Sequence, residues 1–256
     1  MGPPLLHLAG NGLATITLQR PQHHHRLHRE DLHTLQQHLR TLSAEPLARA
    51  LVITASGPVF CSGFHLGELE EAETGAADPQ LFEHTVDALE ALPLPTVARL
   101  NGSVYGGATD LALACDFRLG VQGMELRMPA ARLGLHYYPS GLQRYVSRLG
   151  LQTAKRLFLL AQAVPAEELL RFGYLDQLVP ADALDAATDA TVQALLAGAP
   201  LALQGMKLSL NDTARGPDAA ASARIAERVA QCANSADLQE GLAAWAGRRS
   251  ARFSGR

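Results

Sequence analysis

The segment from Val97 to Phe117, VARLNGSVYGGATDLALACDF, constrains the fold of this chain more than any other. It reads as a short apolar strand, a bend at Gly106-Gly107-Ala108, and then a helix with apolar spacing. Glycine leaves the backbone N–H groups of such a bend unobstructed, and the first N–H groups of a helix lack partners within it. The bend therefore predicts a place where negative charge is stabilised, such as an oxyanion hole. Close packing of the strand on the helix would also account for the small residues.

Two further strands are expected upstream of this segment. Ala14, Ile16 and Leu18 alternate with polar residues, which is the pattern of a strand with one buried face. The continuous apolar run ALVITA at 50–55 predicts a parallel strand covered on both faces. A second glycine-rich loop, SGPVFCSGFHLGEL, follows that run and would also expose backbone N–H groups. We therefore expect an α/β core.

Beyond residue 181 the pattern becomes wholly helical. Leu184, Thr188 and Leu195 form one stripe at helical spacing, and Leu242 and Trp245 belong to another. We accordingly divide the chain into a core at 1–181 and a helical region at 182–256. A helical appendage of this kind usually covers the core or forms a subunit interface.

Composition limits the compartment and the partners. Hydrophobic residues make up 47% and charged residues 18% of the 256 residues, which favours a globular protein. A formal net charge of −3 provides no general attraction to nucleic acid or to an anionic membrane. Cys61, Cys115 and Cys232 are too few and too scattered for a disulfide framework, and the first residues do not resemble a signal peptide. We expect a cytoplasmic protein with no nucleic-acid or membrane partner.

Two clusters of polar residues have ordinary explanations. Histidines gather between the first strand and the first helix, namely His23, His24, His25 and His28. A metal site needs fixed geometry and supporting partners, so we interpret this tract as a solvated loop and assign no metal site. Basic residues recur farther along, namely Arg144, Arg148, Lys155 and Arg156. They could serve phosphates, but a solvated helix face is the commoner reason for such a pattern, and we expect that here.

The run LNG-SVY-GGA-TDLA-L-A-CDF resembles the signature of the crotonase (enoyl-CoA hydratase/isomerase) superfamily, position by position. The resemblance extends along nearly the whole chain: Arg20-Pro21 is similar to the turn after the family's first strand, FCSGFHL to its first oxyanion loop, and FGYLDQLVP to its last core strand. It implies a spiral of ββα units with a C-terminal helical trimerisation region. It also implies a homotrimer or dimer of trimers, and an acyl-CoA thioester as substrate, with no cofactor besides that coenzyme A.

The same resemblance assigns residues. The backbone N–H groups of Phe64 and Gly107 correspond to the family's oxyanion hole, whose task is to bind the thioester oxygen as it becomes an enolate. One such donor is typically worth about 2.7–4 kcal/mol in the transition state. The other positions implied to contact substrate are Arg26, Leu27, Cys61, Gly63, His65, Leu66, Gly106 and His136.

Two departures bear on the chemistry. Hydratases of this family use two glutamates, and this chain has Asp110 at the first position and Ala130 at the second. Hydration needs one group to activate water and another to protonate carbon, so Ala130 argues against efficient hydration. Double-bond isomerisation needs a single proton shuttle, and Asp110 is our candidate for that acid/base. Alternatively, Asp110 is an acidic residue that only complements the helix dipole.

The stretch LGLHYYPSGL supports a different hypothesis. It resembles the corresponding loop of methylmalonyl-CoA decarboxylase, a crotonase relative, with Tyr137 at the tyrosine that faces the acyl group. Decarboxylation needs an oxyanion hole, a group that orients the carboxylate and a proton source. His65, His136 and Tyr137 are candidates for these roles, and each would equally serve as a packing residue of its loop. A third hypothesis is a CoA-thioester binding protein whose chemistry has decayed.

Overall fold

The structure is a computed structural model, and it describes residues 2–65, 67–68, 78–216 and 218–256. Its strands are β1 (Leu5–Leu8), β2 (Leu13–Leu18), β3 (Ala50–Ala55), β4 (Val59–Cys61), β5 (Thr96–Leu100), β6 (Ser103–Tyr105), β7 (Phe117–Val121), β8 (Glu125–Arg127), β9 (Val164–Pro165) and β10 (Gln177–Val179). Its α-helices are α1 (Arg29–Ala44), α3 (Leu81–Glu90), α4 (Ala108–Ala114), α5 (Pro139–Leu149), α6 (Leu151–Lys155), α7 (Ala166–Arg171), α8 (Leu184–Leu196), α9 (Pro200–Ala214), α10 (Ala219–Ala233) and α11 (Ala236–Ala246). Shorter helical turns are η1 (Pro21–His23), η2 (Ala130–Leu133), η3 (Arg156–Leu160) and η4 (Ala181–Ala183).

The strands form two sheets. The larger has the order β1-β2-β3-β5-β7-β10, and the smaller has the order β4-β6-β8-β9. All neighbours from β2 to β10 in the larger sheet are parallel, while β1 pairs antiparallel with β2. Both strand predictions are confirmed: β2 alternates between buried and half-buried residues, and β3 is almost wholly buried. A strand between two parallel neighbours and covered on both faces needs apolar side chains along its whole length.

The chain repeats one unit as it builds these sheets. β3, β5 and β7 each lie in the larger sheet, and each is followed at once by β4, β6 or β8 in the smaller one. Helices α3 and α4 then complete the first two units. This is the expected spiral of ββα units. Because β4 pairs in parallel with β6, the loops that follow these two strands lie at the same edge of the smaller sheet.

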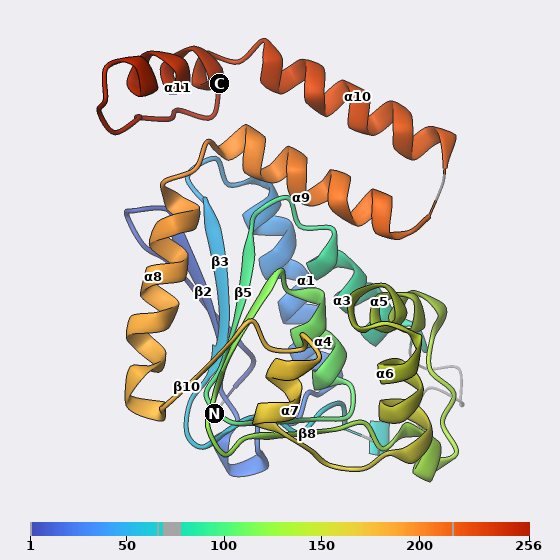
Figure 1. The fold of residues 1–256 in the computed structure, drawn as a ribbon. Helices are drawn as coiled ribbons and strands as arrows, with labels where there is room; N and C mark the ends of the chain where they lie inside the picture. The colour runs from blue at the N-terminus through green and yellow to red at the C-terminus, as the bar shows by residue number, and fades with distance from the viewer. Residues whose placement is uncertain (1, 66, 69–77, 217) are drawn as a thin grey trace.

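Helices cover both faces of the larger sheet (Figure 1). α8 packs against β3, β5 and β7 on one face, while α1, α3 and α4 lie on the other. In α1 the leucines at helical spacing point to the core, and Leu32, Leu35, Leu39 and Leu42 are all buried. Burial of this stripe stabilises the helix far more than its propensity alone would.

The C-terminal helices extend beyond the sheets. α9, α10 and α11 form an arm past the ends of the strands, with α10 packed along α9 (Figure 1). α8, although it follows residue 181, is part of the sheet's covering layer. The division of the chain into two domains at residue 181 stays a prediction. Among the described residues no single helix suits a membrane span; Ala181–Leu196 and Pro200–Ala214 reach that length and hydropathy only together, across a bend of 105°.

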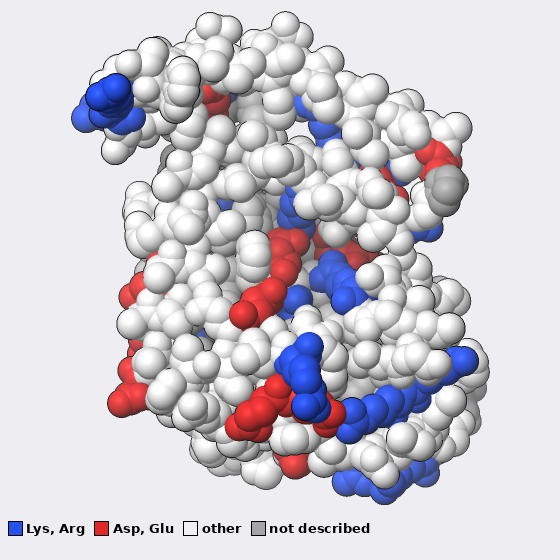
Figure 2. Space-filling model, in the orientation of Figure 1, with Lys and Arg blue, Asp and Glu red and all other residues white. Residues whose placement is uncertain are grey.

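The arm differs from the core in surface character. Figure 2 shows basic and acidic side chains interspersed over the core on this face, whereas the arm is mostly uncharged away from its ends. Large apolar side chains on the arm are exposed, namely Met206, Leu210, Val229, Leu242 and Trp245, the last with 83% of its surface accessible. Exposed large apolar side chains, where they adjoin, mark interaction surfaces.

Candidate active site

The two glycine-rich loops predicted from the sequence meet in space. β4 pairs in parallel with β6, so the loops that carry Phe64 and Gly107 leave the smaller sheet side by side. Gly63 has a φ of +93°, and a Cβ atom there would lie 2.7 Å from the Tyr105 carbonyl oxygen and 3.1 Å from the Gly107 nitrogen. Only glycine tolerates both this backbone conformation and this contact. The small residues at this point therefore allow one loop to touch the other.

The amide groups of Phe64 and Gly107 are available to a ligand. Leu27 pairs with Phe64 in an isolated parallel β-bridge. The two hydrogen bonds of this bridge use the residues on either side of Phe64: the Leu27 N–H donates to the Gly63 carbonyl, and the His65 N–H donates to the Leu27 carbonyl, both at 2.8 Å. This pairing leaves the N–H of Phe64 itself unused. Gly107 precedes the first turn of α4. Within the described part of the chain, neither N–H has an acceptor at hydrogen-bond distance.

Both residues line one cavity of about 370 Å³. Its wall is largely aromatic and apolar, and its lining residues are Ser62, Gly63, Phe64, Pro79, Phe82, Glu83, Tyr105, Gly106, Gly107, Met128, Pro129, Ala130, Leu133, Leu135, His136, Tyr137 and Tyr138. The Phe82 ring covers Gly107 so closely that a Cβ atom there would lie 2.6 Å from Phe82 Cζ. The cavity thus combines two bare N–H donors with an apolar wall, which is the usual composition of a small-molecule site.

Asp110 lies behind this cavity and does not line it. Its side chain is fully buried, and its two oxygens accept hydrogen bonds from the Arg144 guanidinium at 2.9 and 2.8 Å. The hydroxyl of Tyr138 also donates to Asp110 Oδ2. Because Tyr138 lines the cavity, it separates the carboxylate from any bound molecule. Asp110 therefore has no direct access to substrate in this structure.

The ion pair belongs to a larger buried network. Arg144 also donates to Glu90 Oε1 at 3.0 Å and to Asp87 Oδ1 at 2.7 Å, while Arg148 donates to Glu90 at 3.0 Å. Burial raises the pKa of Asp110, and the Arg144 guanidinium opposes that shift. Burial also tends to raise the pKa of Glu90, but Arg144 and Arg148 outweigh it, so the net shift is downward. The ion pairs of this network replace the solvation that the buried charged groups lose on leaving water.

The hydroxyl of Tyr138 is set up as a donor. Burial and the adjacent Asp110 carboxylate both raise the pKa of Tyr138, so its proton stays on at neutral pH. Its ring stacks on that of Tyr137 at a centroid distance of 4.4 Å, and the Tyr137 hydroxyl lies 3.5 Å from the Tyr138 hydroxyl. A chain of polar groups thus leads from the cavity to Asp110.

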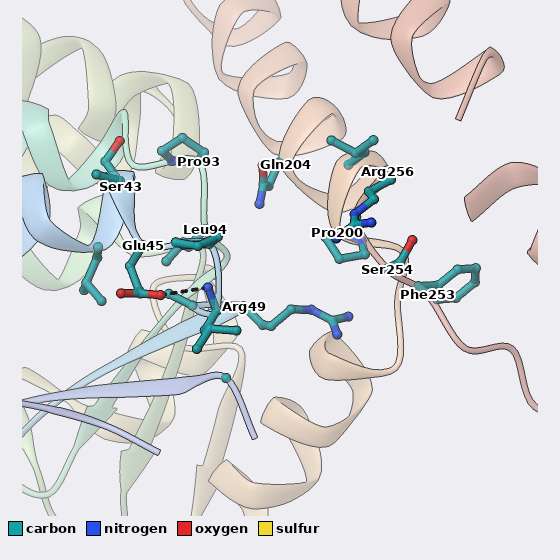
Figure 3. A pocket seen from close by; sticks show the side chains of 18 of the residues that line it. Ser43, Glu45, Arg49, Pro93, Leu94, Pro200, Gln204, Phe253, Ser254 and Arg256 are labelled. Atoms are coloured by element: carbon teal, nitrogen blue, oxygen red, sulfur yellow. Dashed lines mark hydrogen bonds between the residues drawn. The ribbon is translucent and has the colours of Figure 1, made fainter. Parts of the chain in front are cut away.

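A second, larger cavity of about 730 Å³ lies between the core and the C-terminal segment (Figure 3). Side chains of Glu45, Arg49, Gln204 and Phe253 line it. The Arg49 guanidinium donates to the carbonyls of Leu196 and Gly198, at 2.9 and 2.8 Å, and so ties the end of α8 to the core. Neither glycine-rich loop reaches this cavity, so we place the active site at the other one.

Comparison with known proteins decides the family. The family model for enoyl-CoA hydratase/isomerase matches residues 9–256. The chain belongs to the enoyl-CoA hydratase/isomerase family. It is 30% identical to an enoyl-CoA isomerase/hydratase of Mycosarcoma maydis over 81% of each chain, and 27% identical to a crotonyl-CoA hydratase of Syntrophomonas wolfei over 94% of each. Its fold matches the crystal structure of an enoyl-CoA hydratase from Bacillus anthracis with a TM-score of 0.90, at 24% identity over 99% of each chain.

In this member of the enoyl-CoA hydratase/isomerase family, some of the predicted substrate-contact residues line the cavity and others do not. Gly63, Gly106 and His136 line the cavity. The predicted positions outside its lining are Arg26, Leu27, Cys61 and His65, and Leu66 lies outside the described residues. Cys61 is buried, its thiol donates to the His25 carbonyl, and burial raises its pKa to about 12. These assignments to coenzyme A stay predictions.

The expectation of a solvated basic face is wrong for Arg144, which is fully buried. Its acidic partners lie on α3 and α4, so their proximity has no signature in the spacing within α5. No sequence pattern indicated Phe82 or Glu83 as cavity residues. Tyr138 lies next to the candidate residue Tyr137, and both line the cavity.

Proposed function

We propose that the protein binds an acyl-CoA thioester and converts it through a thioester enolate held by the N–H groups of Phe64 and Gly107. The observation that carries the proposal is a pair of N–H donors, without an acceptor among the described residues, on adjoining loops at one apolar cavity. A developing enolate oxygen needs two such donors, and a preorganised donor is worth about 2.7–4 kcal/mol in the transition state. No cofactor beyond the substrate's coenzyme A is required for this chemistry.

Among the family's reactions, isomerisation of a 3-enoyl-CoA to the 2-enoyl isomer fits the cavity best. Ala130 lines the wall where a hydratase would supply its second glutamate. Isomerisation only removes a proton from C2 and returns it to C4, so one proton-transfer group suffices. We assign that group to Asp110 acting through Tyr138. As the Tyr138 oxygen accepts the C2 proton, its own hydroxyl proton passes to Asp110, and no phenolate accumulates.

The charges in the network support this relay. Negative charge disappears at Asp110 when the enolate forms, so the cavity gains one negative charge while the buried network loses one. The raised pKa of Asp110 makes its carboxylate a stronger base than an exposed aspartate. Glu83 is the alternative base, since it is the one carboxylate among the described residues that line the cavity. It lies on α3 and accepts a hydrogen bond from Ser140 Oγ at 3.3 Å.

A matched set of variants tests the assignment. The assay is conversion of 3-hexenoyl-CoA to its 2-enoyl isomer, followed by chromatography with mass detection, together with α-proton exchange in D2O. Tyr138→Phe and Asp110→Asn should each lower kcat by roughly 10²–10⁴, the usual contribution of a general acid or base. Glu83→Gln should leave most activity. Loss of activity in Glu83→Gln with retention in Tyr138→Phe would contradict the relay and make Glu83 the base.

Decarboxylation is a second candidate, and one observation favours it. His136 and Tyr137 line the cavity whereas Asp110 does not, and loss of CO2 forms an enolate without a base. Methylmalonyl-CoA supplied to the wild type would then release CO2, and Tyr137→Phe would slow that reaction more than Asp110→Asn. Tight binding of CoA thioesters without any turnover would instead indicate a binding protein.

The exposed apolar face of the arm supports a homo-oligomer. Leu210, Leu242 and Trp245 are 69%, 56% and 83% exposed in the single chain. We propose that these residues are covered in a homotrimer or a dimer of trimers. Light scattering after gel filtration measures the mass directly, and a monomer would contradict this part of the proposal.

A further inference from the structure

The start of α1 and the first oxyanion loop bring together two histidines and a glutamate that the proposed reaction does not use. His28 immediately precedes α1, while His65 follows Phe64 and Glu68 lies three residues further on. The groups are therefore separated by up to 40 residues in the chain. None of the three lines the candidate active-site cavity.

The three side chains lie close together around one carboxylate oxygen of Glu68. His28 Nδ1 lies 2.5 Å from Glu68 Oε1, and His65 Nδ1 lies 3.7 Å from the same oxygen. The two imidazole rings stack at a centroid distance of 4.8 Å. One ligand atom from each residue lies within 4.8 Å of the others. With side-chain exposures of 24%, 29% and 17%, the cluster is largely shielded from water yet reachable from it.

We propose that His28, His65 and Glu68 bind a divalent transition-metal ion such as Zn²⁺. Two imidazoles and one carboxylate are a donor set that Zn²⁺, Co²⁺ and Ni²⁺ accept. Metal–ligand bonds of about 2.0–2.2 Å put ligand atoms roughly 3.3 Å apart in a tetrahedral site. The His65–Glu68 distance is close to that value, whereas His28 and Glu68 must separate by less than an ångström. Binding thus replaces their hydrogen bond with two bonds to the metal.

The surroundings hold Glu68 in place for this role. Its second carboxylate oxygen accepts the backbone N–H of Arg29 at 2.8 Å, which orients the first oxygen toward the histidines. Such supporting hydrogen bonds are a regular feature of metal sites. The guanidinium of Arg29 is directed to the main-chain carbonyls of Glu68 and Asp78, at 2.7 and 3.2 Å. Its positive charge is thereby satisfied by carbonyl dipoles.

The other histidines of the tract do not join this cluster, and the expectation of a solvated loop is wrong for His25, which is buried. The buried His25 accepts the Arg20 N–H at Nδ1 and donates from Nε2 to the Ser56 carbonyl at 2.6 Å, so both ring nitrogens are used. His23 and His24 are exposed. Only His28 of the tract meets ligands from a distant loop. The ion would link the start of α1 to the loop that carries Phe64, a residue that lines the active-site cavity.

The test uses purified full-length protein stripped with a chelator and reloaded with Zn²⁺. Equilibrium dialysis with mass-spectrometric metal analysis should show a single zinc ion per chain. His65→Ala and Glu68→Gln should weaken binding by more than roughly 10- to 100-fold, the range seen when only a supporting residue is lost. The double variant His23→Ala/His24→Ala is the matched control and should bind zinc like the wild type. Circular dichroism establishes that each variant is folded.

X-ray absorption spectroscopy at the zinc edge identifies the ligands in the zinc-loaded wild type, so this measurement does not depend on whether a variant folds. Scattering from two imidazole rings is expected. The proposal is overturned if the wild type binds no zinc at micromolar concentration, if the spectrum lacks imidazole scattering, or if only the His23/His24 double variant loses binding.

Discussion

Replacing Arg144 with leucine tests the buried network most directly. The guanidinium is fully buried and donates to three carboxylates, those of Asp87, Glu90 and Asp110. Leucine fills part of the space but leaves Asp110, among the described residues, with the Tyr138 hydroxyl as its one side-chain hydrogen-bond donor. Glu90 retains Arg148 and Arg215. The uncompensated charge is therefore concentrated at Asp110.

The expected cost follows from that burial. Removing one partner of a buried ion pair destabilises a protein by about 3–5 kcal/mol, because the remaining charge is neither solvated nor paired. For a chain of this size, about 2–4 °C of Tm accompanies each kcal/mol, so the melting temperature should fall by roughly 6–20 °C. The double variant Arg144→Leu with Asp110→Leu should recover much of the loss, since the orphaned charge is gone.

Chemical denaturation at fixed protein concentration measures the free energy of unfolding. The matched control is Arg224→Leu, which removes the same group from a pair with Asp212 in which the arginine is 47% exposed. Asp212 is itself buried but keeps its pair with Arg228, and the lost arginine is partly exposed, so this control should cost no more than about 1 kcal/mol. Equal effects of the two substitutions, or a loss below about 1 kcal/mol for Arg144→Leu, would refute the argument that burial makes this pair essential.

The deficit should also depend on pH. Without Arg144, burial raises the folded-state pKa of Asp110 further above its unfolded value. A carboxyl whose folded pKa is raised contributes stability below its unfolded pKa and loses it as pH rises through the folded pKa. Arg144→Leu should thus lie closer to the wild type at pH 5 than at pH 7.5. A deficit that grows on acidification would contradict this sign.

Three other outcomes are expected. Gly107→Ala keeps the backbone N–H but places a methyl group against Phe82, so it should cost about 1–3 kcal/mol of stability and lower kcat by displacing the loop, with Phe82→Leu restoring part of both; unchanged stability and turnover would argue against the close contact between Gly107 and Phe82. Trp245→Glu should lower the mass seen by light scattering, because it charges the exposed apolar face of the arm; an unchanged oligomer would exclude Trp245 from the interface. Iodoacetamide at pH 8 should label the half-buried Cys232 and spare Cys61, whose pKa is raised to about 12 by burial; labelling of Cys61 on peptide mapping would contradict its buried placement.

Local patterns predicted much of the fold. The alternation in β2 and the apolar run of β3 record which faces are buried, so they could be interpreted before any tertiary contact was known. The glycines at 63 and 107 lie where a Cβ atom would meet the Tyr105 carbonyl and the Phe82 ring, because glycine at a bend reports on the space around it; the approach of their N–H groups to a ligand stays a prediction. The resemblance to the crotonase superfamily then supplied the order of the units, and the family is now established.

The sequence by itself thus determined the α/β class, the family and the two loops that carry bare N–H groups. Only the tertiary structure decided what surrounds Asp110: a cation 34 residues away on α5 pairs with it, and Tyr138 screens it from the cavity. It likewise decided that His28, rather than the rest of the histidine tract, meets His65 and Glu68. The physical reason is common to both. Periodicity reports how a residue faces its own element, whereas the pKa of a buried carboxylate and the geometry of a ligand cluster depend on side chains from other elements, which no local pattern records.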